Sequence, residues 1–566
     1  LDVNLLMVLA ALGAAAVNQW REGAILMFLF SLSGALEHYA MGRSRHAIRA
    51  LLKLSPEQAL VRRDDVERIV PVEELVVGDV VIVRPGERLP ADGTVLAGIS
   101  SVDQAPITGE SVPVPKSPGS PVFAATINGD GALEIGVAKL AGESTLARVI
   151  RMVEEAQAER TPTQRMTEWI GTRYTIGVLF VVGLFIAVPP LMFGAAFAPA
   201  FYRAMTLMTV ASPCALVIST PAAILSAIAA AAKRGVLFKG GGALEELGRV
   251  NCVAFDKTGT LTRGTPEITD LVPAPGVITD VLVAVAGAVE RHSEHPLARA
   301  VVASATEHEL LLPRASGFRA IVGNGVEAVI AGERARVGTV ALLADTDVIV
   351  PEAALLRAEA LRAAGKTVVF VARGAMYLGC IALADTIRPS ARGVIAALKR
   401  LGVRQTVMLS GDNARVAEAI GAELGLDSVR AELLPEDKLT AIHELQERYG
   451  AVAMVGDGVN DAPALAAATV GIAMGGAGTD VALETADVAL MADDLATLAD
   501  GVDLSRRARR VVRQNVTIAL GVIVVLAPIA ALGFIRLPIG VVAHEGSTLV
   551  VVANGLRLLA ARRTMQ

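Results

Sequence analysis

The sequence predicts a multi-domain membrane protein, in which an α-helical transmembrane bundle carries a β-rich domain, a doubly wound α/β domain and an inserted α+β domain. Apolar stretches about as long as a bilayer span alternate with long polar insertions. Short alternating strands fill the first insertion, and buried strands that end in carboxylates alternate with helices in the second. At 566 residues, 53% of them hydrophobic and 19% charged, the chain is too long for one core and too apolar for a wholly soluble protein.

Composition also limits the class of partner. The net charge is −5 and no long basic block is present, so the sequence lacks the basic character of nucleic-acid-binding proteins. We therefore expect no nucleic-acid partner. Three cysteines, Cys214, Cys252 and Cys380, are too few for a disulfide framework and suit a reducing compartment. The first apolar stretch lacks the basic region and cleavage site of a signal peptide. Because the chain begins at Leu1, we expect further residues to precede it.

The apolar stretches predict about six membrane helices, near residues 4–18, 23–41, 174–193, 204–232, 516–535 and 538–556. Basic residues flank most of them on one side, which the positive-inside rule makes cytoplasmic: Arg43, Arg45, Arg49, Lys233, Arg234, Arg506, Arg507, Arg509, Arg510, Arg562 and Arg563. Both polar insertions, roughly 50–165 and 235–505, then lie in the cytoplasm. Buried core helices of a soluble protein are the alternative, and the tight clustering of apolar residues argues against them.

Residues 56–140 alternate apolar and polar positions in short runs broken by glycine and proline turns, which predicts a small β-rich domain. This domain contains the run Thr108-Gly109-Glu110-Ser111. Its carboxylate is a candidate general base for water, because hydrolysis needs a base within hydrogen-bond reach of the attacking oxygen. Taken alone, such a run would be an ordinary turn.

A second carboxylate, Asp256, ends an apolar strand and begins the run Asp256-Lys257-Thr258-Gly259-Thr260-Leu261-Thr262. The carboxyl ends of parallel strands are where open α/β sheets bind ligands. Small and hydroxylated residues after the strand let backbone N–H groups approach a phosphate. We therefore expect Asp256 to be the nucleophile of a phosphoryl-transfer reaction. A turn capped by aspartate would explain the aspartate and the glycine, but not the whole run.

Two later strands also end in carboxylates, and helical patterns near 413–424 and 436–447 separate them. This alternation predicts a doubly wound parallel sheet. The residues that it brings to the same edge as the nucleophile are Ser410, Gly411, Asp412, Asp457 and Asp461, with Lys438 at the start of the second helical pattern.

Between the nucleophile and the returning strands, residues 265–385 form an insertion with its own pattern. It contains Glu290, His295, Gly323 and Gly325. Each feature alone is weak, because a glycine-asparagine-glycine run is usually a hairpin turn and a lone histidine is usually solvated. Their order within the insertion makes them candidates for a nucleotide site.

The fourth and sixth apolar stretches contain a candidate ion site. The run Ser212-Pro213-Cys214 interrupts the fourth, since proline cannot donate to the helix ladder. A structural kink beside an inert cysteine is the alternative. His544 and Glu545 stand in the sixth stretch, followed by Thr548, and ionisable residues inside a span are costly and by default functional. Sulfur, imidazole and carboxylate ligands together suit Zn²⁺ or Co²⁺ better than Cu⁺.

On these motifs the whole chain resembles the heavy-metal-transporting P-type ATPases, and the membrane motifs resemble those of the cobalt/zinc-exporting subgroup. The resemblance implies an aspartyl phosphate formed on Asp256 from ATP, with Mg²⁺ held by Asp256, Asp457 and the backbone of Thr258. It also assigns catalytic roles to Lys257, Thr258, Thr108, Gly109, Glu110, Ser410, Gly411, Asp412, Lys438 and Asp461. The adenosine part of ATP would lie at Glu290, His295, Gly323 and Gly325, and the transported ion at Ser212, Cys214, His544, Glu545 and Thr548.

Two positions depart from the family pattern. Ser410 stands where the family more often has threonine, and a hydroxyl is kept. Ser547 stands where the subgroup usually has glycine. The resemblance implies transmembrane helices in 1–50, 166–236 and 506–566, an actuator domain in 51–165, a haloacid-dehalogenase-like phosphorylation domain in 237–264 and 386–505, and a nucleotide-binding domain in 265–385.

The resulting hypothesis is an ATP-driven exporter of a divalent transition metal ion, with Co²⁺ or Zn²⁺ favoured. A pump of the same family that transports Cd²⁺, Fe²⁺ or Cu⁺ is the alternative. We expect a monomer in a bacterial plasma membrane with its catalytic domains in the cytoplasm. A soluble phosphatase shares the aspartate chemistry, but would not need the membrane spans. A metal-gated channel or sensor would not need Glu110, Asp256, Lys438 and Asp457 together.

Overall fold

The computed structural model divides the chain into two compact units, residues 1–250 with 486–566 and residues 251–485. It describes residues 3–52, 56–63, 66–104, 113–144, 147, 151, 161–321, 323–344, 348–458, 461–475, 485–491 and 494–560. The expected phosphorylation domain, 237–264 and 386–505, therefore extends beyond the second unit at both ends. All three cysteines are free and buried.

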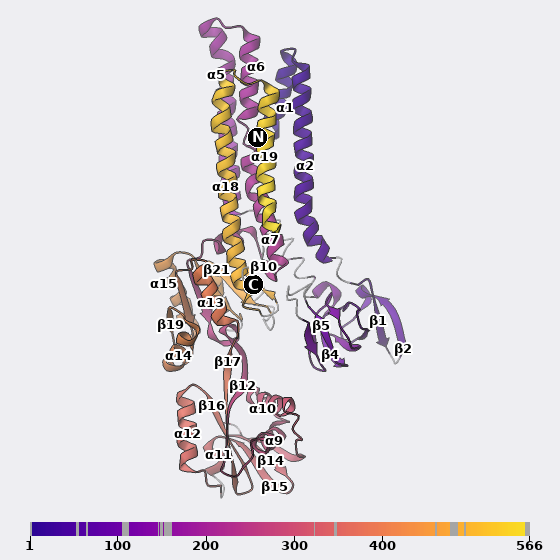
Figure 1. The fold of residues 1–566 in the computed structure, drawn as a ribbon, viewed down its shortest axis with the longest axis vertical. Coiled ribbons are helices and arrows are strands. Elements are labelled where there is room, and N and C mark those ends of the chain that lie inside the picture. The colour runs from indigo at the N-terminus through magenta and orange to yellow at the C-terminus, as the bar shows by residue number, and fades with distance from the viewer. Residues whose placement is uncertain are drawn as a thin grey trace. The chain divides into compact units, whose positions relative to one another are not determined.

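The first unit contains a bundle of long helices that lie side by side (Figure 1). Helices occupy every stretch predicted to span a membrane: α1 (Val3–Ala16), α2 (Trp20–Leu52), α5 (Pro162–Phe193), α6 (Phe197–Val210), α7 (Cys214–Ala232), α18 (Thr497–Ala531) and α19 (Leu537–Leu556). Within the described residues, four helical segments are long and apolar enough to cross a membrane, when α6 and α7 are counted together. The α1 helix is shorter than a span.

The helices differ in how much of their surface the protein covers. The apolar window of the α6–α7 segment is 72% buried, whereas that of α5 is 11% buried. Exposed side chains on α5 and α18 are large and apolar, including Phe180 and Val524. Lipid can cover such surfaces because it is as apolar as they are. The α6–α7 pair is therefore the centre of the bundle, and α5 lies at its periphery.

The predicted kink in the fourth stretch is a break between two helices. The α6 helix ends at Val210, and α7 begins at Cys214. Pro213 cannot donate a hydrogen bond, and its carbonyl accepts from the N–H groups of Leu216 (3.0 Å) and Val217 (3.1 Å) to open the next helix. The break thus places Cys214 in the first turn of α7, at the centre of the bundle.

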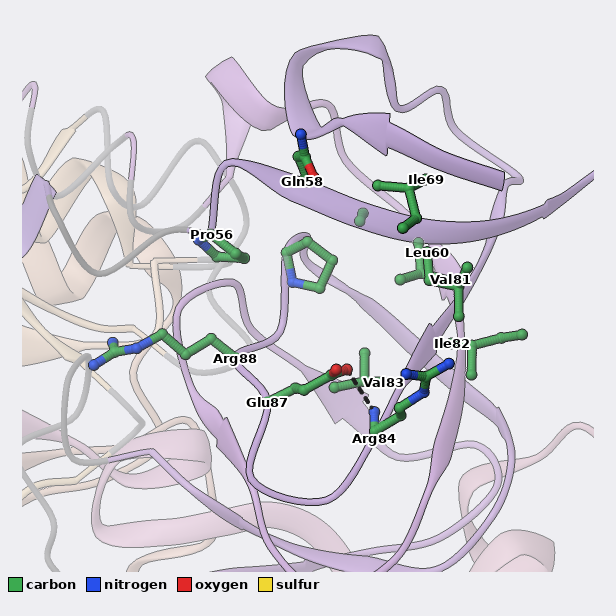
Figure 2. Close-up of a pocket in the computed structure, with 12 residues that line it drawn as sticks. Pro56, Gln58, Leu60, Ile69, Val81, Ile82, Val83, Arg84, Glu87 and Arg88 are labelled. Carbon is green, nitrogen blue, oxygen red and sulfur yellow. Dashed lines mark hydrogen bonds between the residues drawn. The ribbon is translucent and has the colours of Figure 1, made fainter. Parts of the chain in front are cut away.

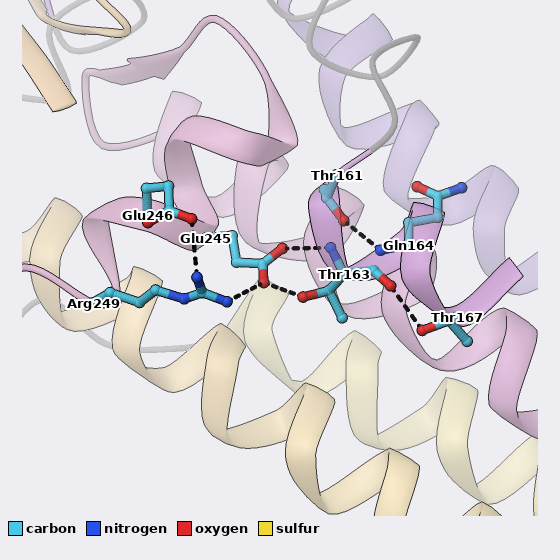
Figure 3. A network of polar contacts seen from close by, with 7 residues as sticks. All are labelled: Thr161, Thr163, Gln164, Thr167, Glu245, Glu246 and Arg249. Atoms are coloured by element: carbon cyan, nitrogen blue, oxygen red, sulfur yellow. Dashed lines mark hydrogen bonds and ion pairs between the residues drawn. The ribbon is translucent and has the colours of Figure 1, made fainter. Parts of the chain in front are cut away.

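Polar contacts fix the start of α5 against the short helix α8 (Gly241–Leu247), as Figure 3 shows. Thr161 caps α5 by accepting from the N–H of Gln164 at 3.0 Å. The Glu245 carboxylate accepts from the N–H of Thr163 at 3.3 Å and from its hydroxyl, and pairs with Arg249 at 3.1 Å. A carboxylate at a helix N-terminus also complements the helix dipole.

The first polar insertion is β-rich, as predicted. One sheet has the strand order β2-β1-β3-β9-β4-β7 and a small one the order β6-β5-β8. The strands are β1 (Gln58–Arg63), β2 (Val66–Pro71), β3 (Val80–Val83), β4 (Gly93–Ala97), β5 (Ser100–Asp103), β6 (Val114–Lys116), β7 (Pro121–Val122), β8 (Ile127–Asn128) and β9 (Leu133–Val137). Alternate residues of β9, such as Leu133 and Ile135, point into its core.

A hollow of about 400 Å³ lies beside β1 and β3 (Figure 2). Its rim includes the turn after β3, where the Glu87 carboxylate accepts from the N–H of Arg84 at 2.9 Å. Gly86 has a φ of 80° in this turn, a conformation that favours glycine. The proline- and glycine-rich run after β3 thus forms a fixed turn.

The second unit holds the doubly wound sheet that the sequence predicts. Five of its strands are parallel and ordered β21-β20-β11-β18-β19. They are β11 (Cys252–Asp256), β18 (Gln405–Leu409), β19 (Ser428–Arg430), β20 (Val452–Gly456) and β21 (Val470–Met474), and the helices α13 (Ala391–Arg400), α14 (Ala414–Leu424), α15 (Pro435–Tyr449) and α16 (Ala462–Ala467) connect them. The chain runs from β11 to β18 and β19, then returns to the other side of β11. Asp256 therefore ends the strand at which the order reverses, where such sheets bind ligands.

A second sheet in this unit is antiparallel and has the order β12-β17-β16-β15-β14-β13. Its strands are β12 (Thr262–Pro273), β13 (Ala315–Ile321), β14 (Gly325–Ile330), β15 (Glu333–Gly338), β16 (Thr367–Arg373) and β17 (Met376–Ile387). One core packs it against α9 (Thr279–Glu290) and α10 (Pro296–Glu307). A second core packs it against α11 (Val340–Ala344) and α12 (Glu352–Ala363). The insertion is thus an α+β domain with helices on both faces of its sheet.

Candidate functional site

The loop after β11 presents Asp256 to a cavity of about 250 Å³. Gly259 adopts a φ of 73° in the tight turn that follows the strand. A Cβ atom at this position would lie 2.9 Å from a carboxylate oxygen of Asp457, so glycine is needed for the loop to approach that carboxylate. The turn therefore brings the loop backbone, Asp256 and Asp457 to the same cavity.

Lys438 links two of the carboxylates. It lies in the first turn of α15, and its Nζ atom is 2.6 Å from Oδ1 of Asp256 and 2.6 Å from Oδ1 of Asp461. Each of the three side chains is buried. Burial alone lowers the pKa of Lys438, but the carboxylates of Asp256 and Asp461 outweigh it, so this pKa is raised and the ammonium is kept.

Negative charge exceeds positive charge at the nucleophile. Burial raises the pKa of Asp256 to about 7, the charges of Asp461 and Asp457 add to the rise, and Lys438 opposes it. Asp256, Asp457 and Asp461 thus bring three carboxylates to the end of the sheet, where the Lys438 ammonium pairs with two of them, Asp256 and Asp461. Hard oxygen ligands with surplus negative charge fit Mg²⁺, which takes one or two carboxylates together with substrate phosphates. Asp256, Asp457 and the backbone of Thr258 line the cavity and would hold it.

Ser410, directly after β18, has a local structural role. The Ser410 hydroxyl, which is 1% exposed, accepts from the N–H of Asp412 at 3.1 Å. Asp412 in turn pairs with Lys257 from the nucleophile loop. Ser410, Gly411, Asp412 and Lys257 line the same cavity as Asp256. The structure thus brings together the predicted residues of the phosphorylation loop and of the second strand end.

Asp385 and Arg388 were not among the predicted site residues, and both hold the nucleophile loop. Arg388 donates to the carbonyls of Gly259 and Thr262, each at 3.0 Å. Asp385 accepts from the Thr262 hydroxyl at 2.5 Å and from the N–H of Gly264 at 2.8 Å. In the sequence these two residues form a charged pair at the end of β17, just before the chain returns to the parallel sheet. Only the fold shows which groups the pair contacts.

The four residues predicted to bind the nucleotide differ in burial and in structural role. Glu290 ends α9 and is 8% exposed, and burial raises its pKa to about 7, against a smaller lowering by the Ser293 hydroxyl. His295 caps α10 by accepting from the N–H of Leu297 at 3.2 Å. Gly323 has a φ of 80° with open space around it. A Cβ atom at Gly325 would lie 2.2 Å from the carbonyl oxygen of Val337, so sheet packing by itself requires this glycine.

The predicted dephosphorylation residues, Thr108, Gly109 and Glu110, lie outside the described residues. Nothing in the structure therefore bears on their positions.

The membrane motifs meet at the centre of the bundle. Ligand atoms of Cys214, His544 and Glu545 all lie within 4.8 Å of one another. Cys214 is at the start of α7, whereas the other two are neighbours on α19. The Ser212 hydroxyl is 3.1 Å from the Cys214 sulfur. Thr548, one turn beyond His544, is 2% exposed.

The ring of His544 is buried among these ligands. Within the described residues, neither ring nitrogen makes a hydrogen bond of ordinary geometry, although the backbone of Val210 lies beside the ring. A buried polar group without such a bond is costly, and a ligand at this point would remove the cost. Ser547 fits into the continuous α19 helix by donating to the carbonyl of His544 at 2.6 Å. This cluster is therefore a candidate metal-binding site.

Comparisons with known proteins show which family the chain resembles. A P-type ATPase actuator-domain model matches residues 53–154, and a haloacid dehalogenase-like hydrolase model matches residues 250–469. The chain is 44% identical to a zinc-transporting ATPase of Bacillus subtilis, over 99% of this chain and 87% of that one. It is 44% identical to a probable cobalt/nickel-exporting P-type ATPase of Mycobacterium bovis, over 99% and 85%. A probable cadmium-transporting ATPase of Staphylococcus aureus is 43% identical, over 99% and 70%.

The fold is also found among solved structures. A crystal structure of a zinc-transporting PIB-type ATPase in the E2.Pi state matches with a TM-score of 0.67 and 44% identity, over 99% of this chain and 90% of that chain. These matches cover both the unit that contains Asp256 and the membrane helices, so the alternative of a soluble phosphatase is excluded. The chain belongs to the heavy-metal (PIB-type) P-type ATPases, membrane enzymes that hydrolyse ATP to transport a metal ion.

Proposed function

We propose that this ATPase exports Zn²⁺ or Co²⁺ from the cytosol. The observation that carries the proposal is the meeting of sulfur, imidazole and carboxylate ligands within 4.8 Å at the centre of the bundle. A single soft ligand is a poor match for Cu⁺, which prefers several sulfur atoms, whereas a mixed set suits borderline divalent ions. Cd²⁺ and Fe²⁺ are the further candidates. The relatives named for cadmium, zinc and cobalt/nickel transport have 43%, 44% and 44% identity, so overall similarity does not choose among these ions.

In the proposed cycle an oxygen of Asp256 attacks the γ-phosphorus of ATP. The bond from that phosphorus to the bridging oxygen breaks, ADP leaves, and an aspartyl phosphate remains. Bound Mg²⁺ would neutralise phosphate charge. Lys438 supports this assignment, because its ammonium is 2.6 Å from Oδ1 of Asp256 and can follow the charge onto the phosphoryl oxygens. Asp461 holds the ammonium from the other side at 2.6 Å, which makes it a positioning residue.

Water then attacks the phosphorus of the aspartyl phosphate, the bond to the Asp256 oxygen breaks, and inorganic phosphate leaves. We assign the orientation of that water to Glu110, with Thr108 and Gly109 shaping its loop, because this step needs a base close to the attacking oxygen. Lys257 and Asp412 would close one side of the cavity through their ion pair, with Ser410 and Gly411 beside them.

For the nucleotide we propose a place in the antiparallel domain, beside Glu290, His295 and Gly323. Open space at Gly323 supports its part, since a backbone without a side chain can approach a ligand closely. The part of Gly325 is less direct, because its close contact with Val337 already explains the glycine.

The proposal also includes the membrane, the orientation of the chain and its partners. We propose a bacterial plasma membrane with both polar insertions in the cytoplasm, a functional monomer and no nucleic-acid partner. The support is the distribution of arginine and lysine around the spans and the lack of a long basic block in the sequence.

The test is ATP hydrolysis by the full chain in lipid vesicles with Zn²⁺, Co²⁺, Cd²⁺, Fe²⁺ or Cu⁺ added singly. Zn²⁺ or Co²⁺ should stimulate hydrolysis most, and Cys214→Ala should remove the stimulation. Cys380→Ala is the matched control, because it removes a buried thiol from the antiparallel domain instead. Strongest stimulation by Cu⁺, or stimulation that survives in Cys214→Ala, would contradict the proposal.

A further inference from the structure

A groove between α18 and α19 has no part in ATP hydrolysis or in the metal site. Its volume is about 770 Å³. The lining divides into a polar end and an apolar wall: Arg513, Gln514, Asn554 and Arg557 at one end, and Thr517, Ile518, Val550 and Ala553 beyond them. No carboxylate is among these residues, so the groove is positively charged at its polar end.

The two arginines come from different helices and are exposed. Arg557 donates to the side-chain oxygen of Asn554 at 2.7 Å. Within the part of the chain that the structure describes, neither Arg513 nor Arg557 makes an ion pair with a carboxylate. An arginine fork without an anionic partner is well suited to phosphate, which can accept two parallel hydrogen bonds.

The groove lies where the bundle changes from polar to apolar surroundings. The first turns of α18, including Leu498 and Asp503, are buried in the protein. Farther along the helix, Leu520 and Val524 are large, apolar and exposed, as expected of side chains that face lipid. Arg513 lies between these two parts. Val550, on the facing helix, is 54% exposed and continues the apolar wall.

A hydrogen-bonded chain gives the groove a rigid back. The Asn554 amide donates to the side-chain oxygen of Asn515 at 2.8 Å. Asn515, which is fully buried, donates to the carbonyls of Val551 at 3.1 Å and Ser219 at 3.4 Å. Ser219 belongs to α7, so the polar end is fixed to the helix that carries Cys214.

We propose that this groove binds an anionic phospholipid. Arg513 and Arg557 would hold the phosphate oxygens, the Gln514 amide would donate to another headgroup oxygen, and an acyl chain would lie along Ile518, Val550 and Ala553. Asn554 would position Gln514 and Arg557, because its amide donates to the side-chain oxygen of Gln514 and its own oxygen accepts from Arg557. Free phosphate would use the arginines as well, but it would leave the apolar wall exposed to water. Basic pockets between membrane helices are recognised sites for anionic headgroups, so the paired charge and the wall favour the lipid.

The test uses the full chain in nanodiscs of phosphatidylcholine that contain a small fraction of spin-labelled phosphatidylglycerol or spin-labelled phosphatidylcholine. The motionally restricted fraction of each label measures lipid held at the protein. We expect phosphatidylglycerol to be held about tenfold more strongly than phosphatidylcholine, and the double variant Arg513→Gln/Arg557→Gln to lose most of that preference.

The control is Arg509→Gln/Arg510→Gln, which removes the same charge from nearby exposed positions of α18 that do not line the groove. It should keep the preference, and millimolar inorganic phosphate should not displace the lipid. An equal loss in both double variants would show a general surface-charge effect and overturn the site. Equal restriction of the two lipids would overturn it too, and displacement by inorganic phosphate would identify a free-phosphate site instead.

Discussion

The nucleophile site and the membrane metal site both bury ionisable groups, but they balance charge differently. At the nucleophile, Lys438 lies 2.6 Å from each of two carboxylates, so the groups are paired before any substrate binds. At the candidate metal site, the His544 nitrogens and the Thr548 hydroxyl make no hydrogen bond of ordinary geometry among the described residues. A buried polar atom in that state favours binding of a ligand that satisfies it. The lysine thus neutralises part of the buried charge at the first site, whereas we expect a bound ion to stabilise the second.

The largest expected effect separates the two sites. Asp256→Asn should give no phosphoenzyme from ATP, because an amide is far too poor a nucleophile to replace the carboxylate. Glu545→Ala should also remove metal-stimulated hydrolysis, yet still form phosphoenzyme from inorganic phosphate, since its nucleophile is intact. Acid-stable radioactive label measures both reactions. A labelled Asp256→Asn protein would end the assignment of the nucleophile, and undiminished metal stimulation in Glu545→Ala would end that of the ligand.

Glu110→Gln tests whether Glu110 acts as the base in hydrolysis of the aspartyl phosphate, the second step of the proposed cycle. Phosphorylation should persist, while decay of the phosphoenzyme slows by about 10²–10⁴-fold, the usual contribution of a general base. The decay is measured by chasing labelled enzyme with unlabelled ATP. Decay at the wild-type rate would give Glu110 another role.

Arg388→Ala asks how far the nucleophile site depends on its supporting contacts. The guanidinium donates to the carbonyls of Gly259 and Thr262, so its loss frees the loop that carries the nucleophile. Phosphorylation should slow by about 10–100-fold, because a misplacement near 1 Å can cost about that much. The occupancy of the membrane metal site, measured on the purified protein, should not change. Arg392→Ala is the matched control, and an equal slowing in it would refute a role specific to the loop.

The last prediction concerns stability rather than rate, at a buried carboxylate for which no cationic partner is found among the described residues, in contrast to Asp256. Burial raises the pKa of Glu290 to about 7, above its usual value near 4.5. The unfolded chain therefore loses this proton at lower pH than the folded chain, and the stability of the domain falls as pH rises from about 4.5 to 7. Glu290→Gln should remove that loss, which is of the order of 3 kcal/mol above pH 7. Thermal unfolding of the full chain at pH 5 and pH 8 measures it, and an unchanged pH dependence in the variant would contradict the burial argument.

The sequence alone determined the main secondary-structure elements and which side chains are candidates for the two sites. The strand that ends at Asp256, the alternation of strands and helices after it and the apolar spans are local patterns, fixed by hydrophobic periodicity and chain chemistry. The sequence also singles out Cys214, His544 and Glu545 as candidate ligands, because ionisable groups inside apolar runs are rare.

Only the tertiary structure decided which of these groups meet. Lys438 pairs with both Asp256 and Asp461, and Arg388 donates hydrogen bonds to the nucleophile loop, so these contacts join segments far apart in the chain. Likewise the break at Pro213, rather than a kink in one helix, brings Cys214 to within 4.8 Å of ligands on α19. Such contacts depend on how whole helices and strands pack, and local periodicity carries no information about distances between elements.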